Sequence, residues 1–375
     1  MSTPGKVLQN TILVLLSLLF SFFCVEWILR LAHIEDTYGY PEGLYMNDPL
    51  LGYKMAPKIE GTLIKPEFAT FVHTNSLGLR DREYESKRPS DYRMLALGDS
   101  FTWGGYGTQL NETFIKIVEQ KLNGSLEQNI QVINSGVPGY GIEQESLYAQ
   151  SEGIKLEPDM ILLNFYVGND FTGKFLAEKA PKANEKGQLV SLNSMPLRNF
   201  LLEHLHSFRF FERRILPFFG GVIENYFPNI LDSSGKTGDI YKIKYDRGTE
   251  SRVKNTLGAI GKLNLYCKDN NIELMVVVIP TIFQVYDNVK ESFIRASMLG
   301  KDDFDFNKPQ ALLKELFLRE NIKFIDLLPE FKKLSSNHDL YWSLNPHFNK
   351  KGNEIAAKII FNRLKDFIPR RGDNT

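Results

Sequence analysis

Four residues that could carry out nucleophilic chemistry follow predicted strands or precede the last predicted helix. Ser100 comes directly after an apolar run that ends at Gly98, and Gly136 follows a second such run. Asn169 follows a third run, and His347 lies just before the final amphipathic segment. Ligands of doubly wound folds bind where the parallel strands end. These four residues are therefore the candidates for a functional site.

Each candidate has a chemical role that suits its position. A serine at a strand end is exposed as a nucleophile, and neighbouring backbone N–H groups can stabilise an oxyanion. A glycine after a strand lets a substrate approach its N–H closely, as at Gly136, and Asn169 adds a side-chain amide donor. His347 is a candidate general base. Each feature alone is common in turns and helix caps, but their joint order is not expected by chance.

In their sequence context, the four residues resemble the conserved blocks of the SGNH/GDSL hydrolases. The blocks here are RMLALGDSFTWG, INSGVPGYG, NFYVGND and NPHFNKKG. The upstream phrase TNSLGLR is similar to bacterial, membrane-anchored members of that family. The resemblance covers roughly residues 48–368 outside a long excursion. It implies a flavodoxin-like, three-layer α/β/α fold with a parallel sheet.

The resemblance also implies a role for each residue. Ser100 is the nucleophile, and its own N–H, the Gly136 N–H and the Asn169 side chain form the oxyanion hole. His347 takes the serine proton and returns it to the leaving group, so that acyl transfer runs through an acyl-enzyme. No cofactor or metal is implied. The G-x-S-x-G elbow of α/β-hydrolases is absent, so that fold is not favoured.

The residue that should orient the histidine departs from the family pattern. The family places an aspartate three, or in some branches two, residues before the histidine, where this chain has Leu344 and Asn345. A neutral asparagine can accept a hydrogen bond from the ring but cannot balance an imidazolium charge. In the trypsin triad, an Asp→Asn change costs about 10⁴ in kcat.

Three interpretations follow from this departure. A Ser100–His347 dyad could work with Asn345 or the backbone as its orienting group. Asp339, the nearest acid upstream, could take the place of the missing aspartate. The site could also be weak or inactive. We favour the dyad because all three oxyanion donors are present.

Apolar runs that alternate with amphipathic segments predict a doubly wound parallel sheet. Strands are expected at 93–97, 130–134, 160–165, 273–279 and 323–327. Helices are expected at 111–122, capped by Asn111, at 143–153 and at 353–367.

The chain divides into three predicted parts. Residues 1–35 form a membrane anchor, residues 36–92 a short β-rich lead-in, and residues 93–370 the hydrolase domain. The hydrolase domain is interrupted by an excursion at about 172–250. The excursion starts with a polar loop at 174–194, and its aromatic and basic part at 199–227 is expected to pack on the body as a cover helix. A lid or a second membrane contact is the alternative.

The N-terminal segment has the length and composition of a membrane span. Residues 11–25 carry no charge, and the stretch continued to Leu31 contains 21 residues. At 1.5 Å per residue it is about 31 Å long, close to the roughly 30 Å hydrocarbon core of a bilayer. Glu26 and Arg30 lie four apart on one helix face and can pair. A retained single-span anchor is favoured.

Other interpretations of this segment fit less well. A cleaved signal peptide needs small residues at its cleavage site, which are missing here, and a lipoprotein needs a small residue where Phe23 precedes Cys24. A buried helix of a soluble protein is the remaining alternative. Lys6 precedes the span, and Glu35 and Asp36 follow it, which places the body on the periplasmic or extracellular side.

Composition excludes several classes of protein. The 375 residues contain 45 basic and 45 acidic side chains, which argues against a nucleic-acid partner. Two cysteines rule out a disulfide scaffold and a four-thiolate zinc site. His204 and His206 have no carboxylate or thiol companions at ligand spacing, so a metal site is not predicted.

The favoured function is a serine-dependent esterase or deacetylase of the cell envelope, acting on an acylated glycan or lipid. One alternative is an O-acyltransferase of an envelope polysaccharide that uses the same serine and receives its acyl group from a membrane partner protein. The other is a catalytically degenerate protein of the same fold that binds glycans.

Overall fold

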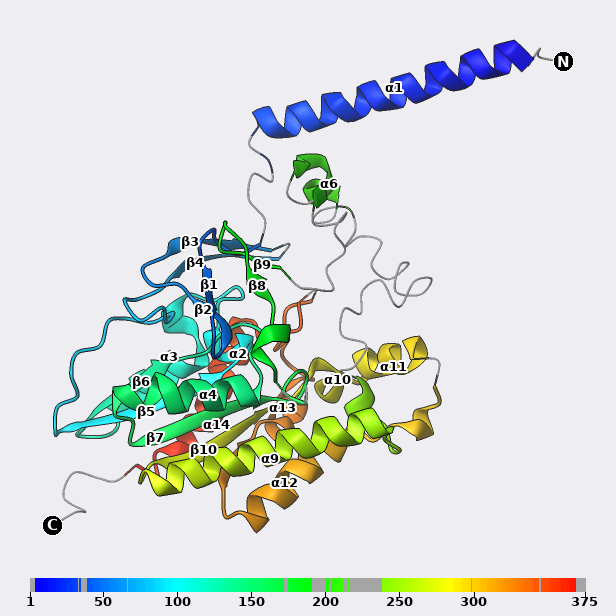
Figure 1. Cartoon of the computed structure of the whole chain (residues 1–375). Coiled ribbons are helices and arrows are strands. Elements are labelled where there is room, and N and C mark those ends of the chain that lie inside the picture. Colours follow the sequence, from blue (N-terminus) through cyan, green and yellow to red (C-terminus); the bar gives the residue numbers. More distant parts are fainter. Residues whose placement is uncertain are drawn as a thin grey trace.

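Five parallel strands form the central sheet of the chain, seen in a computed structural model (Figure 1). The structure describes residues 4–32, 34, 39–65, 67–171, 175–190, 200–201, 204–211, 215, 238–297, 299–343 and 345–368. The strands are β5 (Asp91–Gly98), β6 (Asn129–Asn134), β7 (Met160–Tyr166), β10 (Glu273–Ile279) and β11 (Lys323–Asp326). They are ordered β11-β10-β7-β5-β6, which is the flavodoxin-like order. The predicted fold class is thereby confirmed.

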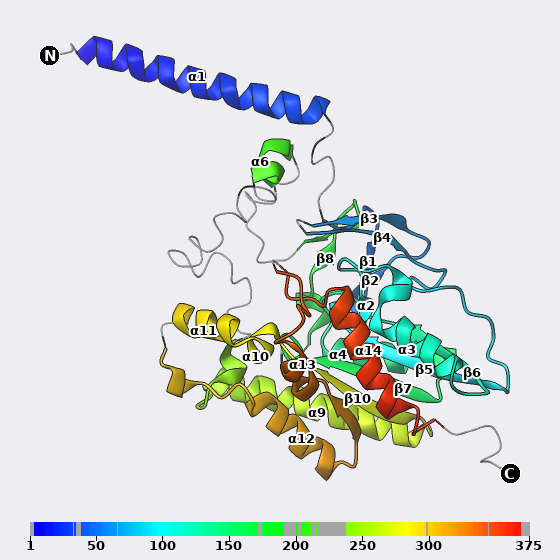
Figure 2. The same cartoon turned by 180° about the vertical axis from the view of Figure 1, so that it is seen from behind.

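Helices cover both faces of this sheet and complete the three layers (Figures 1 and 2). One face carries α4 (Ile142–Ser151), α9 (Arg247–Asp269) and α12 (Lys308–Arg319). The opposite face carries α3 (Phe114–Asn123), α13 (Leu328–Leu334) and α14 (Lys350–Leu364). The short helices α10 (Ile282–Val285) and α11 (Asp287–Ala296) follow β10.

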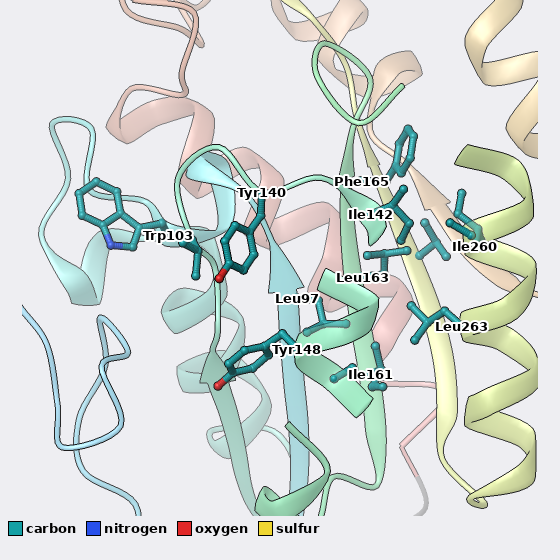
Figure 3. Close-up of a cluster of buried hydrophobic side chains, with 14 of the residues drawn as sticks. Leu97, Trp103, Tyr140, Ile142, Tyr148, Ile161, Leu163, Phe165, Ile260 and Leu263 are labelled. Atoms are coloured by element: carbon teal, nitrogen blue, oxygen red, sulfur yellow. The ribbon is translucent and has the colours of Figure 1, made fainter. Parts of the chain in front are cut away.

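Successive side chains of each strand enter different cores, because a strand alternates its two faces. Leu95 and Leu97 of β5 belong to the core under α4 and α9, whereas Met94 and Ala96 belong to the core under α3 and α14. Figure 3 shows the first core, with Leu97 and Leu163 of the sheet facing Ile142 of α4 and Ile260 of α9. Both faces are buried, so the strands read as continuous apolar runs.

Two helix starts differ from the sequence prediction. Residues 110–112 form a 3-10 turn, and α3 begins after it, with Thr113 as its cap in place of Asn111. Helix α14 begins at Lys350, earlier than predicted, because the Asn349 side chain accepts a hydrogen bond from the Gly352 N–H. The hydrophobic period locates a helix but does not identify which polar residue caps it.

The lead-in is β-rich, as predicted, and packs onto the body. Strands β1 (Tyr45–Asp48) and β2 (Gly52–Met55) form one antiparallel pair, and β3 (Glu60–Ile64) and β4 (Ala69–His73) form another. Leu63 and Val72 are fully buried in the same core as Leu97 of the sheet.

The described part of the excursion contains more structure than predicted. In place of a loop, strands β8 (Lys182–Ala183) and β9 (Leu189–Val190) form a small antiparallel pair. Asn47 of the lead-in exchanges two hydrogen bonds with the Ala183 backbone, at 2.9 and 3.0 Å. Further on lies α6 (His206–Phe210), while most of residues 199–227 fall outside the described residues.

Helix α1 (Pro4–Leu31) lies apart from the body in both views (Figures 1 and 2). Its stretch from Gly5 to Leu31 is long and apolar enough to cross a membrane, a test that a signal sequence would also pass. Glu26 and Arg30 form the predicted ion pair, with 2.7 Å between Arg30 Nε and Glu26 Oε1.

Close packing makes glycine necessary at position 136. A Cβ on Gly136 would lie 2.3 Å from the Trp103 backbone nitrogen in α2 (Ser100–Trp103). Substitution Gly136→Ala should therefore push α2 outward and lower the free energy of unfolding by about 1–3 kcal/mol. Urea denaturation of the detergent-solubilised full-length chain measures this loss.

The matched control for this substitution is Gly258→Ala in α9, where an added Cβ meets nothing within 4 Å. It should stabilise the protein by roughly 0.5–1 kcal/mol, because alanine favours a helix over glycine. Equal stability of Gly136→Ala and the wild type would contradict the packing described for α2.

Candidate active site

The nucleophile candidate lies in the first turn of α2, directly beyond β5. Asp99 caps this helix, since its Oδ1 accepts a hydrogen bond of 2.8 Å from the Phe101 N–H. The chain can turn here because Gly98 has a φ of +154° and a Cβ on it would lie 2.0 Å from Thr102 Oγ1. Ser100 is thus held at the carboxyl end of β5, with 8% of its surface exposed.

Ser100, His347 and Asn345 form one chain of hydrogen bonds. Asn345 Oδ1 accepts from the His347 backbone N–H at 3.2 Å and from His347 Nδ1 at 2.5 Å. Because a carbonyl oxygen only accepts, Nδ1 carries the proton, and Nε2 of a neutral ring is left as an acceptor. The Ser100 hydroxyl then donates to Nε2 at 2.7 Å. This is the geometry of a serine with a poised general base.

The imidazole of His347 lies among aromatic rings. Tyr106 stacks on it with 3.8 Å between ring centroids and 4° between planes, and the Phe101 centroid is 4.8 Å away. The pKa of His347 is lowered to about 3, mainly by desolvation and secondly by the positive charge of Lys65. With its pKa lowered, neutral His347 is a weak base, and its protonated form is a strong acid. A general base works best when its pKa is near the working pH.

The structure does not bring Asp339 to His347. Asp339 is exposed, and its backbone carbonyl accepts a hydrogen bond of 2.7 Å from Asn349 Nδ2. The Nδ1 position that it would have to contact is taken by Asn345. Leu344 lies outside the described residues.

Two of the three predicted oxyanion donors, Gly136 and Asn169, have partners within the protein. The Gly136 N–H donates to Asn134 Oδ1 at 3.1 Å. Asn169 Nδ2 donates to Asp99 Oδ2 at 2.7 Å, which places the amide beside Ser100. An amide nitrogen has two N–H groups, so Asn169 keeps a second donor for a ligand. Gly136 has a single N–H and would have to share it with Asn134 or release it.

Asp99 is a functional residue that the sequence pattern did not single out. It caps α2 and orients the Asn169 amide with its two carboxylate oxygens. Desolvation is the largest cause that raises the pKa of Asp99 to about 6. Its position immediately before a short helix was the available signal, because aspartate is a preferred cap.

The upstream TNSLGLR phrase holds the far end of α2. Arg80, which is 1% exposed, donates to the carbonyl of Trp103 at 2.9 Å and to that of Thr108 at 2.9 Å. These two acceptors lie at the end of α2 and in the glycine-rich bend after it. The lead-in therefore fixes the helix that carries Ser100.

The cavity beside Ser100 and His347 is small. It is lined in part by Tyr106 and Phe348, and its volume of about 10 Å³ is roughly that of one water site.

His204 and His206 lie far from this site in the chain and make backbone contacts. The Nδ1 of His204 pairs with the Phe200 carbonyl at 2.9 Å, and that of His206 with the Ile34 carbonyl at 3.0 Å. In the described part of the chain, no group of three or more His, Cys, Asp or Glu side chains is placed to hold a metal ion.

No protein-family model matches the chain, and no curated protein matches it. Among solved structures, a lipase/acylhydrolase from Enterococcus faecalis is similar, with a TM-score of 0.42 and 12% identity over 75% of this chain and 98% of that one. The acetyl xylan esterase AlAXEase has a TM-score of 0.41 and 13% identity over 72% of this chain and 98% of its own.

A catalytic mutant of an acetylxylan esterase from Geobacillus stearothermophilus has a TM-score of 0.41 and 13% identity, over 75% of this chain and 97% of that one. All three proteins are named as ester hydrolases, the activity class that the SGNH/GDSL resemblance implies. At these identities and TM-scores, no site or substrate is transferred from them.

The hydrogen bonds of His347 predict its protonation state. In the ¹⁵N-histidine-labelled chain, His347 should stay neutral with its proton on Nδ1 from about pH 8 to about pH 5, although a free histidine titrates near 6.5. The reason is that burial and Lys65 both disfavour the imidazolium. Nitrogen chemical shifts report the tautomer, and His347→Gln identifies the signal.

A carboxylate at position 345 should make the imidazole of His347 easier to protonate. Substitution Asn345→Asp places an opposite charge on Nδ1, which should raise the pKa of His347 by about 1–3. The imidazolium signal should then appear at a higher pH than in the wild type. A wild-type His347 that is already protonated at pH 6 would contradict the neutral environment described here.

Proposed function

We propose that this chain is a membrane-anchored serine ester hydrolase of the SGNH/GDSL type. Its substrate is an acylated glycan or lipid of the cell envelope, from which it removes a short acyl group through an acyl-enzyme. The observation that carries this proposal is the hydrogen bond of 2.7 Å between Ser100 Oγ and His347 Nε2, with Nδ1 fixed by Asn345.

The reaction starts from the serine. Ser100 Oγ attacks the ester carbonyl while its proton moves to Nε2 of His347. The Ser100 N–H, the second N–H of Asn169 and the Gly136 N–H stabilise the oxyanion. As the tetrahedral intermediate collapses, the C–O bond to the alcohol breaks, and His347 protonates the leaving alkoxide. Water then attacks the acyl-serine and gives a proton to Nε2. As the bond between Ser100 Oγ and the acyl carbon breaks, Nε2 returns that proton to Ser100 Oγ, and the acid is released.

The low basicity of His347 favours proton donation to the leaving group over proton removal from Ser100. With Asn345 in place of an aspartate, no negative charge balances the imidazolium while it exists. The proton is therefore slow to leave Ser100 and quick to reach the leaving group. We expect slow turnover that a carboxylate at position 345 would accelerate.

The anchor is part of this proposal. Helix α1 would remain as a single span, with the body on the periplasmic or extracellular side, as the charges around the span predict. The long apolar stretch of α1 and its separation from the body support the single span.

Asn345 favours one competing function, a glycan-binding protein that has lost catalysis. A transferase would use the same serine but would need an acyl donor delivered by a membrane partner protein.

Turnover of an acetyl ester separates the hydrolase from the binding protein. Ser100→Ala should abolish hydrolysis of 4-nitrophenyl acetate, because the hydroxyl is the only group that can form the acyl-enzyme. Asn345→Asp should raise kcat by about tenfold or more, since the reverse change in trypsin costs about 10⁴.

The matched control is Ser343→Ala, which removes an exposed hydroxyl four residues before His347 and should leave turnover unchanged. Full activity of Ser100→Ala would refute the proposed nucleophile. A wild type and an Asn345→Asp variant that both lack turnover, while the wild type binds acetylated glycan, would favour the binding protein.

A further inference from the structure

The described part of the aromatic excursion contacts the membrane helix. In both views α6 lies beside the end of α1 that leads into the body (Figures 1 and 2). This differs from the cover helix expected from the sequence. The described residues 204–211 are here called the α6 segment.

Glu26 of α1 is the centre of the contact. Its side chain is buried, as is that of Leu29, although most apolar residues of α1 are exposed, and Glu26 as a whole is 5% exposed. One carboxylate oxygen accepts the His206 N–H at 3.0 Å, and the other accepts the Ser207 N–H at 2.8 Å. A buried carboxylate is costly unless such donors satisfy it.

Arg30 completes the contact one turn later. Its Nε donates to Glu26 Oε1 at 2.7 Å, and its Nη2 donates to the His204 carbonyl at 2.6 Å. The His206 ring also pairs with the Ile34 carbonyl at 3.0 Å. We call Glu26 and Arg30 the clamp, because together they bind both sides of the turn that begins α6.

Large apolar side chains are exposed on α1 and also in or next to the α6 segment. Phe211 is 47% exposed, and Phe200, whose ring stacks on His204 at 4.2 Å, is 55% exposed. On α1, Trp27 is 64% exposed and Leu31 is 69% exposed. Aromatic residues next to the end of an apolar span are typical of the membrane–water interface.

We propose that the α6 segment is an interfacial membrane-binding element, held in the bilayer surface beside the end of α1 by the clamp. The partner is the lipid surface itself, because the exposed Phe211 belongs to a segment that is hydrogen-bonded to the end of an apolar span. The charged groups of the clamp are satisfied within the protein, so they can lie at the interface without a lipid partner.

This arrangement gives the body two connections to the membrane. One is the chain that leads from α1 to β1, and the other is the excursion, which leaves the body after β9 and returns to it before α9. The inference rests on the proposed anchor, because α1 has to be in the bilayer for the α6 segment to reach it.

Tryptophan quenching by lipids with brominated acyl chains tests this proposal on the full-length chain in vesicles. Trp27 is first replaced in Trp27→Phe, and a reporter is then introduced by Phe211→Trp. The matched control is Leu318→Trp in α12, where the native leucine is 67% exposed on the catalytic body. Trp103 and Trp342 stay in all variants, and their signal is subtracted with the Trp27→Phe parent.

The reporter at position 211 should lose fluorescence to a degree comparable with native Trp27, whereas the reporter at position 318 should not. Adding Glu26→Ala should reduce the loss at position 211, because the two backbone N–H groups lose their acceptor.

Two outcomes would overturn the inference, and they are distinguishable. If Trp27 is quenched but the reporter at 211 behaves like that at 318, the anchor stands and the α6 segment is not in the membrane. If Trp27 is not quenched either, the proposed anchor fails, and the inference fails with it. Unchanged quenching at 211 after Glu26→Ala would overturn the role of the clamp.

Discussion

The hydrogen bond between Ser100 and His347 joins two ends of the catalytic domain that are 247 residues apart in the sequence. It can form only if the end of β5 and the start of α14 meet at one edge of the sheet. Phe348 is buried there against Phe101 and Phe331, with ring centroids 4.9 Å apart in each pair. Asn353 ties α14 to α3 by accepting the Phe114 N–H at 3.0 Å. The base is thus held by packing and caps on both sides.

Negative charge is kept away from the histidine and placed on the other side of the serine. Asn345, a neutral group, fixes the ring, while the carboxylate of Asp99 orients the Asn169 amide. Behind Asp99 lie two further buried acids, Glu145 and Asp170. Desolvation, with repulsion between the acids, raises the pKa of both groups well above the ordinary value. Their protonated forms are favoured, which limits the negative charge next to the oxyanion site.

Local patterns predicted much of this arrangement. The strand at Glu273–Ile279 and the parallel, doubly wound sheet follow from apolar runs that alternate with amphipathic segments, whereas the flavodoxin-like form of the fold was implied by the family resemblance. Ser100, Asn169 and His347 could be located because strand ends are where such folds bind ligands. Features that depend on contacts across the chain could not be predicted. The burial of Arg80 and the contact of α6 with Glu26 leave no periodic signal in the sequence.

Reaction of the folded full-length chain with a fluorophosphonate, followed by intact-mass and peptide analysis, tests the nucleophilic role of Ser100 most directly. Such a probe requires only an activated serine, so its result does not depend on the unknown acyl group or alcohol. The wild type should gain one phosphonyl group on Ser100, and Ser100→Ala should gain none. A folded wild type that remains unmodified would contradict the Ser100–His347 dyad as a catalytic unit.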